Sequence, residues 1–397
     1  MKKILIFSQA MELGGAERAL LGLLEAIDTT KYSVDLFLMR HQGELMKYIP
    51  DDVNLLPENK KYSCLAIPMK EVIKRGEFRL AFGRIKGRFA AKKRVKQLQL
   101  GENDIANEYS HKYTLPYLPQ VNNIDYDVVI SFVSPHYFAA ERVKAQKKIA
   151  WIHTDYSTLS VDVDSELKMW GKYDNIISIS DNATESFIKT FPSLKDKIVM
   201  IENIMPMKYM LELADAFSAE EEMPNKGVRL LTIGRFCYPK RMDEIPQICM
   251  RIRAAGIDAK WYLIGFGGDE ALIRQRIAEA GAEDFVIILG KKENPYPYIK
   301  ACDIYIQPSR YEGKSVAVRE AQILNKPVII TNYTTAASQL DDGVDGVIVP
   351  MDLDACGDGI IEVIKDKRLQ ETLIENTKKT DYTNASEINK FYALMGE

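Results

Sequence analysis

Two glutamates separated by seven residues lie in the segment of the chain with the most specific chemical pattern. We expect Glu312 in a loop, and Glu320 inside a helix that begins near Ser315. Carboxylates accept hydrogen bonds from vicinal hydroxyls such as those of a ribose or a hexose. Unpaired backbone N–H groups at the helix start, in residues 313–316, favour a phosphate. The segment predicts a site for a hydroxyl-rich ligand that carries phosphate, and the alternative is an amphipathic helix facing solvent.

Two cations stand at the end of an apolar run at residues 229–236 and on the loop directly after it. Arg235 and Lys240 are five positions apart, with Pro239 between them. A departing diphosphate needs such fixed positive charge, because negative charge builds on it as the bond to it breaks. The loop therefore predicts an anion site, and the alternative is a surface loop with scattered charge.

Glycines and one histidine follow other apolar runs. Gly14 and Gly15 open a helix after the first run, and a glycine loop at residues 265–268 follows another. Paired glycines let a ligand approach the backbone, and the following helix N-terminus favours an anion. Either loop could equally be a tight turn. His153 ends a further run, where a histidine is either part of the core or part of a site.

These side chains need strands to position them, and short apolar runs alternate with helix-period segments almost from end to end. The runs are rich in Val and Ile and hardly alternate, as expected of strands that are buried on both faces. The order predicts an α/β protein with doubly wound parallel sheets. We expect strands at residues 3–8, 34–38, 127–132, 148–153, 176–180, 229–236, 260–265, 285–290, 304–307, 328–331 and 346–349.

The number of strands predicts two domains. The polar stretch at residues 204–227 separates the two series, so we expect an N-terminal Rossmann-like domain at 1–205 and a C-terminal one at 206–382. A closing helix within residues 383–397 is expected to pack back on the first domain. Ligands of such sheets bind outside the carboxyl ends of the strands, so we expect the domains to face each other across a cleft.

Composition excludes several classes of protein. The chain has 397 residues, of which 46% are hydrophobic, and a net charge of −3 at pH 7. This charge gives no reason to expect a nucleic-acid partner. No apolar run approaches the ~18 residues of a membrane span, and the apolar start is too short for a signal peptide. We therefore expect a cytoplasmic protein.

One segment breaks the rhythm of strands and helices. Residues 84–96, from Arg84 to Lys96, hold seven basic residues and no acidic one, with Phe82, Ile85 and Phe89 among the apolar side chains in and beside them. A helix of this kind lies on an anionic membrane surface. The alternative is an ordinary helix with a solvated, charged face.

Taken together, these motifs resemble the GT4-type retaining glycosyltransferases of GT-B fold. The Gly-Gly-Ala-Glu sequence, His153, Gly234-Arg235 with Lys240, and the two glutamates occur in the family's order over roughly residues 1–390. The resemblance implies transfer from a nucleotide sugar, by family frequency a UDP-sugar, to a glycan such as a lipid-linked polysaccharide intermediate. It implies front-face substitution with no metal and no cofactor. Peripheral attachment at the inner face of the membrane is expected only from the basic residues 84–96.

The resemblance also implies a role for each motif. Arg235 and Lys240 hold the diphosphate, Glu320 the ribose hydroxyls, and Glu312 the hydroxyls of the donor sugar. The remaining contacts to the donor fall to His153 near the reacting carbon, Gly14 and Gly15 at the diphosphate, Lys292 at the base, and Gly313, Lys314, Ser315 and Val316 at sugar or phosphate. Where many relatives carry an aromatic residue and a glycine, this chain has Lys314-Ser315, which puts the identity of the donor sugar in doubt.

Other functions remain as alternatives. A nucleotide-sugar epimerase of GT-B fold needs acid and base groups that the sequence does not single out. A non-catalytic nucleotide-sugar-binding protein is disfavoured because the charged motifs occur together. Two sequences resemble the metal-binding Asp-x-Asp motif, at residues 125–127 and 162–164, but neither directly follows a strand, so a metal-dependent GT-A enzyme is disfavoured. A dehydrogenase is improbable because no Gly-x-Gly-x-x-Gly follows a strand.

Overall fold

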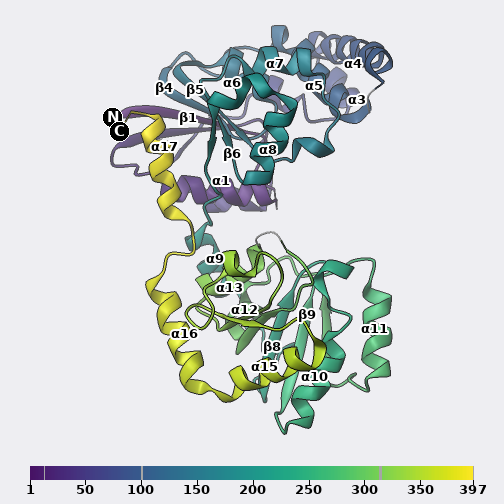
Figure 1. The fold of residues 1–397 in the computed structure, drawn as a ribbon. Helices are drawn as coiled ribbons and strands as arrows, with labels where there is room; N and C mark the ends of the chain where they lie inside the picture. The colour runs from purple at the N-terminus through teal and green to yellow at the C-terminus, as the bar shows by residue number, and fades with distance from the viewer. Residues whose placement is uncertain (13, 100–101, 313–314, 397) are drawn as a thin grey trace. The chain divides into compact units, whose positions relative to one another are not determined.

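The computed structural model describes residues 1–12, 14–99, 102–312 and 315–396. The chain divides into two compact units, and each is a doubly wound α/β sheet (Figure 1). The N-terminal unit comprises residues 1–206 and 384–397, and the C-terminal unit comprises residues 207–383. The fold class predicted from the rhythm of apolar runs is confirmed.

The N-terminal unit is built on a seven-stranded parallel sheet with the order β3-β2-β1-β4-β5-β6-β7. The interior strand β1 buries Ile4, Leu5, Ile6 and Phe7 completely, so both of its faces are covered. The strands are β1 (Lys2–Ser8), β2 (Tyr32–Leu38), β3 (Asn54–Leu55), β4 (Asp125–Ser131), β5 (Lys144–Ile152), β6 (Asn175–Ser178) and β7 (Ile198–Met200).

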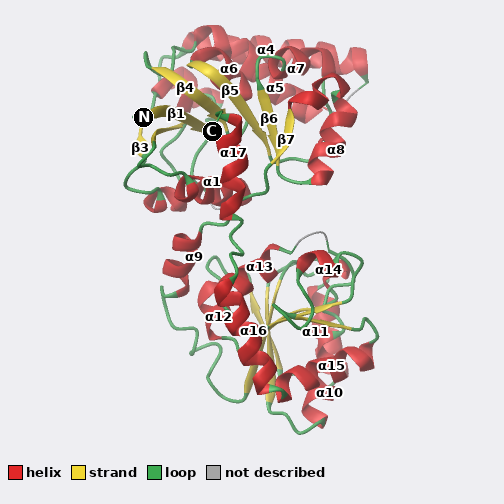
Figure 2. Cartoon of the chain, turned by 60° about the vertical axis from the view of Figure 1, so that its left-hand side comes forward, coloured by secondary structure: helices red, strands yellow, loops and turns green. Residues whose placement is uncertain are grey.

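Helices cover both faces of this sheet (Figure 2). They are α1 (Gly15–Ala26), α2 (Lys60–Ser63), α3 (Met69–Lys74), α4 (Phe78–Leu98), α5 (Glu102–Thr114), α6 (His136–Arg142), α7 (Val163–Trp170) and α8 (Asp181–Thr190). Short 3-10 turns are η1 (Glu44–Tyr48), η2 (Leu115–Tyr117), η3 (Tyr156–Thr158) and η4 (Pro192–Lys197). The basic residues 84–96 lie within α4.

The end of the chain packs on the N-terminal unit through η6 (Ala385–Glu387) and α17 (Ile388–Leu394). The ring of Tyr392 stacks on Tyr32 of β2 at a centroid distance of 5.1 Å, and its hydroxyl accepts a hydrogen bond from the backbone N–H of Asp28 at 2.8 Å. Lys2 donates to the carbonyl oxygen of Met395 at 2.9 Å. Aromatic stacking and hydrogen bonds thus hold residues of opposite chain ends together.

The C-terminal unit has a six-stranded parallel sheet with the order β10-β9-β8-β11-β12-β13. The strands are β8 (Val228–Ile233), β9 (Ala259–Ile264), β10 (Val286–Gly290), β11 (Ile304–Gln307), β12 (Val328–Thr331) and β13 (Val347–Val349). The helices are α9 (Met207–Ala214), α10 (Ile245–Ala254), α11 (Glu270–Glu279), α12 (Tyr296–Ala301), α13 (Val316–Ile323), α14 (Ala336–Gln339), α15 (Leu353–Lys365) and α16 (Lys367–Lys379), with the turn η5 (Tyr238–Lys240).

All eleven predicted strands are present. Some of them end earlier than predicted, and the sheets contain two further strands. Strands β5 and β8 end at Ile152 and Ile233, so His153 and Arg235 lie in the loops beyond them. The edge strands β3 and β7 were missed because they are two and three residues long. Strand β3 is an Asn-Leu pair, and the apolar β7 is shorter than a typical strand of about five to six residues.

Candidate functional site

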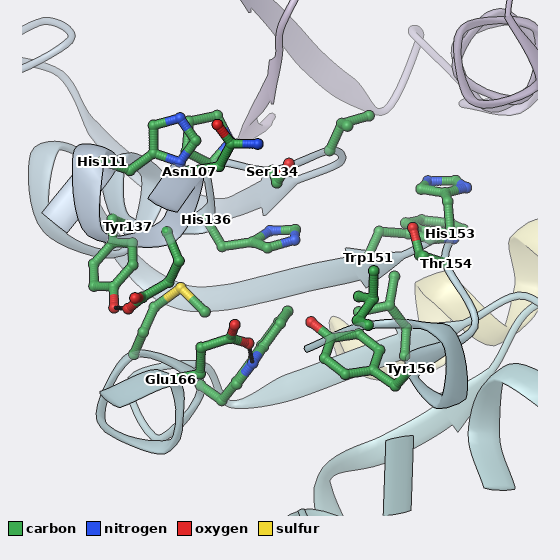
Figure 3. A pocket seen from close by; sticks show the side chains of 17 residues that line it. Asn107, His111, Ser134, His136, Tyr137, Trp151, His153, Thr154, Tyr156 and Glu166 are labelled. Atoms are coloured by element: carbon green, nitrogen blue, oxygen red, sulfur yellow. Dashed lines mark hydrogen bonds between the residues drawn. The ribbon is translucent and has the colours of Figure 1, made fainter. Parts of the chain in front are cut away.

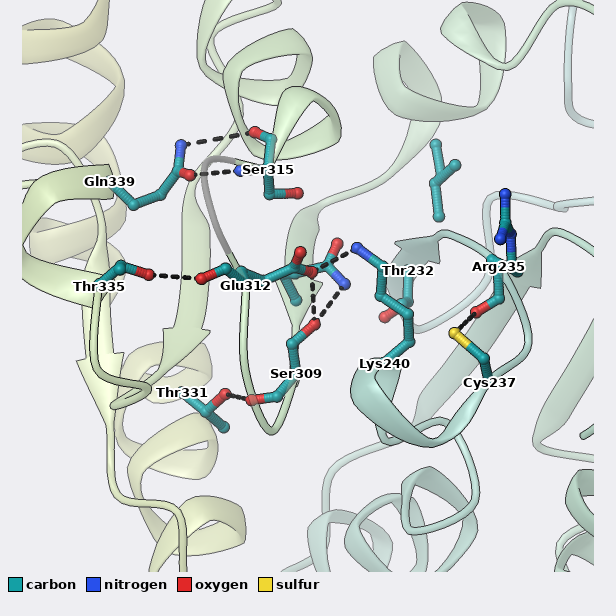
Figure 4. A network of polar contacts seen from close by, with 12 residues as sticks. Thr232, Arg235, Cys237, Lys240, Ser309, Glu312, Ser315, Thr331, Thr335 and Gln339 are labelled. Carbon is teal, nitrogen blue, oxygen red and sulfur yellow. Dashed lines mark hydrogen bonds and ion pairs between the residues drawn. The ribbon is translucent and has the colours of Figure 1, made fainter. Parts of the chain in front are cut away.

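In the C-terminal unit, the loops that follow β8 and β11 meet in an ion pair between Lys240 and Glu312 (Figure 4). Their side chains are only 21% and 11% exposed. The hydroxyl of Ser309 donates a hydrogen bond to the same carboxylate oxygen at 2.7 Å. Solvent screens an ion pair this sheltered from water only weakly, so the attraction between the two side chains is stronger than that of an exposed pair.

A chain of hydrogen bonds at the end of β11 fixes Glu312. Tyr305 donates to Gln307 at 2.8 Å, and the Gln307 amide donates to the hydroxyl of Ser309 at 3.0 Å. The hydroxyl of Thr335 donates to the backbone carbonyl of Glu312 at 2.7 Å. Glu312 is therefore held at both its carboxylate and its main chain, as preorganised binding requires.

Arg310 joins the two loops. Its backbone N–H donates to the carbonyl of Pro239 at 2.7 Å, and its guanidinium donates to the carbonyl of Tyr238 at 2.7 Å. The guanidinium also makes a bidentate pair with Asp243, at 2.9 and 2.8 Å. Hydrogen bonds to Asp243 raise the pKa of Arg310 above its ordinary value. Arg310 thus fixes the distance between the loop of Lys240 and the loop of Glu312.

Arg235 differs from Lys240 although both stand on one loop. Its side chain is exposed, and among the described residues it has no hydrogen-bond or ion-pair partner. In Figure 4 its guanidinium points away from the Glu312 network. An anion could pair with Arg235 directly, whereas it would share Lys240 with Glu312.

Glu320 lies on α13 and is 4% exposed. The hydroxyl of Tyr296, from α12, donates to its carboxylate at 2.9 Å. The predicted free N–H at Ser315 is wrong, because that group donates to the side-chain oxygen of Gln339 at 2.6 Å. Val316 is 54% exposed at the first position of α13. Gly313 and Lys314 lie outside the described residues.

The glycine loop after β9 has a packing role. A Cβ at Gly265, where φ is +154°, would lie 1.8 Å from the carbonyl oxygen of Gly234. A Cβ at Gly267 would lie 2.2 Å from the carbonyl oxygen of Phe236. These two glycines are thus required for the loop after β9 to approach the loop that carries Arg235. Gly268 has open space around it.

Lys292, predicted to meet the base, forms an ion pair with Glu222 at 2.6 Å. The hydroxyl of Tyr298 also donates to Glu222. The hydrogen bond from Lys292 lowers the pKa of Glu222. Lys292 therefore stays a predicted ligand contact whose charge is already paired inside the C-terminal unit.

The N-terminal unit holds a cavity of about 250 Å³ that contains His153. Strand and helix ends from residues 107 to 170 surround it (Figure 3). Its described lining residues include no lysine and no arginine. They are Asn107, Glu108, His111, Val133, Ser134, Pro135, His136, Tyr137, Trp151, Ile152, His153, Thr154, Tyr156, Leu159, Glu166, Met169 and Trp170.

Three histidines of this cavity are neutral at pH 7. Burial lowers the pKa of His111 and His153 to about 4, and that of His136 to about 3. Neither ring nitrogen of His153 has a hydrogen-bond partner among the described residues, and the same holds for the indole N–H of Trp151. Buried polar atoms without a hydrogen bond lower the free energy of unfolding, unless a ligand or a water molecule forms a hydrogen bond with them.

Two glutamates line the same cavity. Burial raises the pKa of Glu166 to about 7, and its carboxylate accepts a hydrogen bond from the Trp170 indole at 3.1 Å. Burial also raises the pKa of Glu108, whose second oxygen lacks a partner among the described residues. The sequence reasoning singled out only His153 here. His111, His136, Glu108 and Glu166 carry no local signal, because α5, α6 and α7 bring them together from distant positions.

Gly14 and Gly15 stand at the start of α1, in the N-terminal unit. A Cβ at Gly14 would lie 2.0 Å from a carboxylate oxygen of Glu17, which folds back over this glycine. Gly15 has open space around it. Their predicted contact with a diphosphate stays a prediction.

The described residues offer no group of three or more His, Cys, Asp or Glu side chains placed to hold a metal ion. Both Asp-x-Asp segments have structural partners. Asp162 and Asp164 pair with Arg94 at 2.7 and 3.0 Å, and Asp127 accepts the backbone N–H of Lys3 at 2.7 Å.

Comparison with known proteins finds a family match for part of the chain. Residues 214–380 match the model of the glycosyl transferases group 1 family. The chain is 27% identical over 155 residues to the amylovoran biosynthesis glycosyltransferase AmsK of Erwinia amylovora, covering 37% of this chain and 36% of that protein. It is 23% identical over 214 residues to the N-acetylgalactosamine-N,N'-diacetylbacillosaminyl-diphospho-undecaprenol 4-alpha-N-acetylgalactosaminyltransferase of Campylobacter jejuni, covering 53% of this chain and 56% of that protein.

The solved structure of HepE of Anabaena in complex with UDP has a TM-score of 0.56 to this chain, at 16% identity, and the alignment covers 99% of this chain and all of that one. The sequence matches span from about a third to just over half of the relatives' own length, and the structural likeness shows the fold. Residues 214–380 therefore resemble the glycosyl transferases group 1 family, and the chain has the GT-B fold.

Proposed function

We propose that the protein is a retaining glycosyltransferase that moves a sugar from a nucleotide-sugar donor, a UDP-sugar, to a glycan acceptor. The observation that carries the proposal is the sheltered pair of Lys240 and Glu312, fixed by Ser309 and joined through Arg310. The match of residues 214–380 to the group 1 family and the UDP complex of HepE support the donor class.

In the proposed reaction, the bond between the anomeric carbon and the diphosphate oxygen breaks. A bond to the acceptor hydroxyl forms on the same face of the sugar, and the hydroxyl proton passes to the departing phosphate. Lys240 and Arg235 stabilise the charge that develops on the diphosphate, so no metal ion is required. Glu312 binds hydroxyls of the donor sugar, and Glu320, held by Tyr296, binds those of the ribose.

The acceptor sugar is proposed to occupy the cavity of the N-terminal unit. Neutral imidazoles, tyrosines and tryptophans suit an uncharged saccharide, because aromatic rings pack on apolar sugar faces while ring nitrogens meet hydroxyls. A phosphate is disfavoured there, since the described lining has no cation. The Campylobacter relative, named for a diphospho-undecaprenol substrate, supports an acceptor linked to a lipid.

A panel of nucleotide sugars tests the proposal. Purified protein with EDTA is mixed with each candidate, and thermal shift and released nucleoside diphosphate are measured. We expect one UDP-sugar to stabilise the protein and to be slowly hydrolysed, and both signals to be lost in Lys240→Ala and Glu320→Ala. The matched controls Lys300→Ala and Glu283→Ala change exposed residues of the same unit and should retain both signals. Loss of turnover with EDTA, or no response to any nucleotide sugar, would contradict it.

A GT-B epimerase is the second candidate. The observation that favours it is the group of Glu108, Glu166, His111 and His136 around one cavity, which supplies acid and base groups. Incubation in deuterated water without acceptor separates the two functions. Epimerisation yields a new nucleotide sugar that carries deuterium, whereas a transferase releases nucleoside diphosphate from unlabelled sugar. Thermal shift without either product would indicate a binding protein.

A further inference from the structure

Helix α4 exposes four large apolar side chains in one row. At about 100° per residue, Phe78, Phe82, Ile85 and Phe89 fall within an arc of about 60° on the helix. Their exposed fractions are 67%, 58%, 43% and 70%. Soluble proteins rarely leave several large apolar side chains side by side in water without a partner.

The opposite face of α4 is closed by direct helix packing. A Cβ at Gly83 would lie 2.8 Å from the Tyr113 carbonyl oxygen, and one at Gly87 would lie 2.7 Å from that of Tyr109, so α4 contacts the backbone of α5. Arg94 is paired with Asp162 at 2.7 Å, and Arg84 donates to the carbonyl of Ile67 at 2.7 Å. These contacts hold the apolar row outward.

Positive charge flanks the row on both sides. Residues 78–98 contain no aspartate and no glutamate. The exposed basic residues are Arg79, Lys86, Arg88, Lys92, Lys93 and Lys96. In helical projection, Lys86 and Lys93 lie on one side of the row, and Arg88 and Lys92 lie on the other. An apolar centre between two basic margins is the pattern of a helix that lies in the membrane interface.

We infer that α4 is a membrane-docking helix, which inserts Phe78, Phe82, Ile85 and Phe89 among the lipids while the flanking basic residues contact anionic headgroups. A second copy of the chain is a poorer occupant, because it would bring two sets of like charges together. Nucleic acid would leave the apolar row unmatched. The inference deepens the lipid-linked acceptor of the proposed function, but it rests on the surface of α4 and not on the reaction.

Flotation with lipid vesicles tests the apolar row. Vesicles are made of phosphatidylcholine alone, or of equal parts of phosphatidylcholine and phosphatidylglycerol. We expect the protein to float with the anionic vesicles, and Phe82→Ser/Phe89→Ser to lower its partition coefficient by at least about tenfold. The matched control Leu211→Ser/Phe217→Ser removes two exposed apolar side chains of the C-terminal unit and should bind like the unaltered protein.

The basic margins have their own variant. Lys86→Gln/Arg88→Gln/Lys92→Gln/Lys93→Gln spares the paired Arg84 and Arg94, and should lower binding to anionic vesicles by about 100- to 1,000-fold. The matched control removes equal charge from the C-terminal unit and should leave binding to anionic vesicles unchanged. It is Lys365→Gln/Arg368→Gln/Lys378→Gln/Lys379→Gln.

Melting temperatures verify that each variant is folded. Undiminished flotation of both α4 variants would overturn the inference. Concentration-dependent dimerisation abolished by Phe82→Ser/Phe89→Ser, without vesicle binding, would also overturn it and would assign the row to a second copy. Because flotation requires no sugar, its result is independent of the result of the nucleotide-sugar panel.

Discussion

Two regions of the molecule differ in the charge of their side chains. One is formed by the loops after β8 and β11 in the C-terminal unit, and the other is the cavity after β4 and β5 in the N-terminal unit. The first region presents Arg235, Lys240 and Glu312, with close glycine packing beneath them. The second presents neutral histidines, tyrosines and tryptophans, and its described lining has no cation. The difference matches a donor that carries a diphosphate and an acceptor that offers hydroxyls. The proposed function therefore assigns the recognition of charge to one region and that of a neutral sugar to the other.

The largest effect is expected at Lys240. Lys240→Met should weaken binding of UDP and slow release of nucleoside diphosphate by about 10²–10³-fold, because the fixed charge at the leaving group is lost. Removing one partner of a sheltered ion pair also leaves Glu312 uncompensated, which lowers the free energy of unfolding. The double variant Lys240→Met/Glu312→Gln should regain stability and remain inactive. Calorimetric titration with UDP and urea unfolding measure the two effects.

Tyr156→Phe, in the cavity of the N-terminal unit, is the control for this comparison. It should leave UDP affinity within about twofold of the original, since the two regions recognise different groups. A comparable loss of UDP affinity in both variants would contradict the division between charged and neutral recognition.

A smaller effect is expected from the glycines that shape the charged region. Gly265→Ala should lower the free energy of unfolding by about 2–4 kcal/mol, because its Cβ meets the Gly234 carbonyl and the backbone conformation is unfavourable for alanine. Gly268→Ala, with open space around it, should change it by less than about 1 kcal/mol. Urea unfolding of the two variants measures the difference. Equal costs would show that packing does not require Gly265.

A smaller effect per pH unit is expected from each of the neutral histidines. Since burial lowers the folded-state pKa of His136 to about 3, this side chain takes up a proton on unfolding between about pH 4 and 6.5. The free energy of unfolding therefore rises with pH in this window, by about 1.4 kcal/mol per pH unit for each such histidine. The pKa of Glu166 is raised to about 7, so this side chain releases a proton on unfolding above pH 4.5. Its contribution lowers the slope that the three histidines produce.

Urea unfolding at several pH values measures this slope. His136→Asn should reduce it by about one proton. An unchanged slope in His136→Asn would show that His136 is not kept neutral by burial.

Much of the fold could be predicted from the sequence, because buried parallel strands appear as short runs of Val and Ile. The loops that carry Lys240 and Glu312 were predicted for the same reason, as polar segments that directly follow such runs. The edge strands β3 and β7 could not be, since their pairing depends on neighbours in the sheet. The packing roles of Gly265 and Gly267 could not be predicted either, because the backbone that leaves no room for a Cβ there belongs to a different loop.

The sequence by itself determined the α/β class, the residues that bring charge to the strand ends, and the basic character of residues 84–96. These properties depend on local periodicity and on side-chain chemistry. Only the tertiary structure decided that Lys240 pairs with Glu312, that His111, His136 and Glu166 share a cavity, and that Arg94 is used by Asp162. The physical reason is that partners and burial depend on which distant segments the strand order brings side by side, and no local pattern records that order.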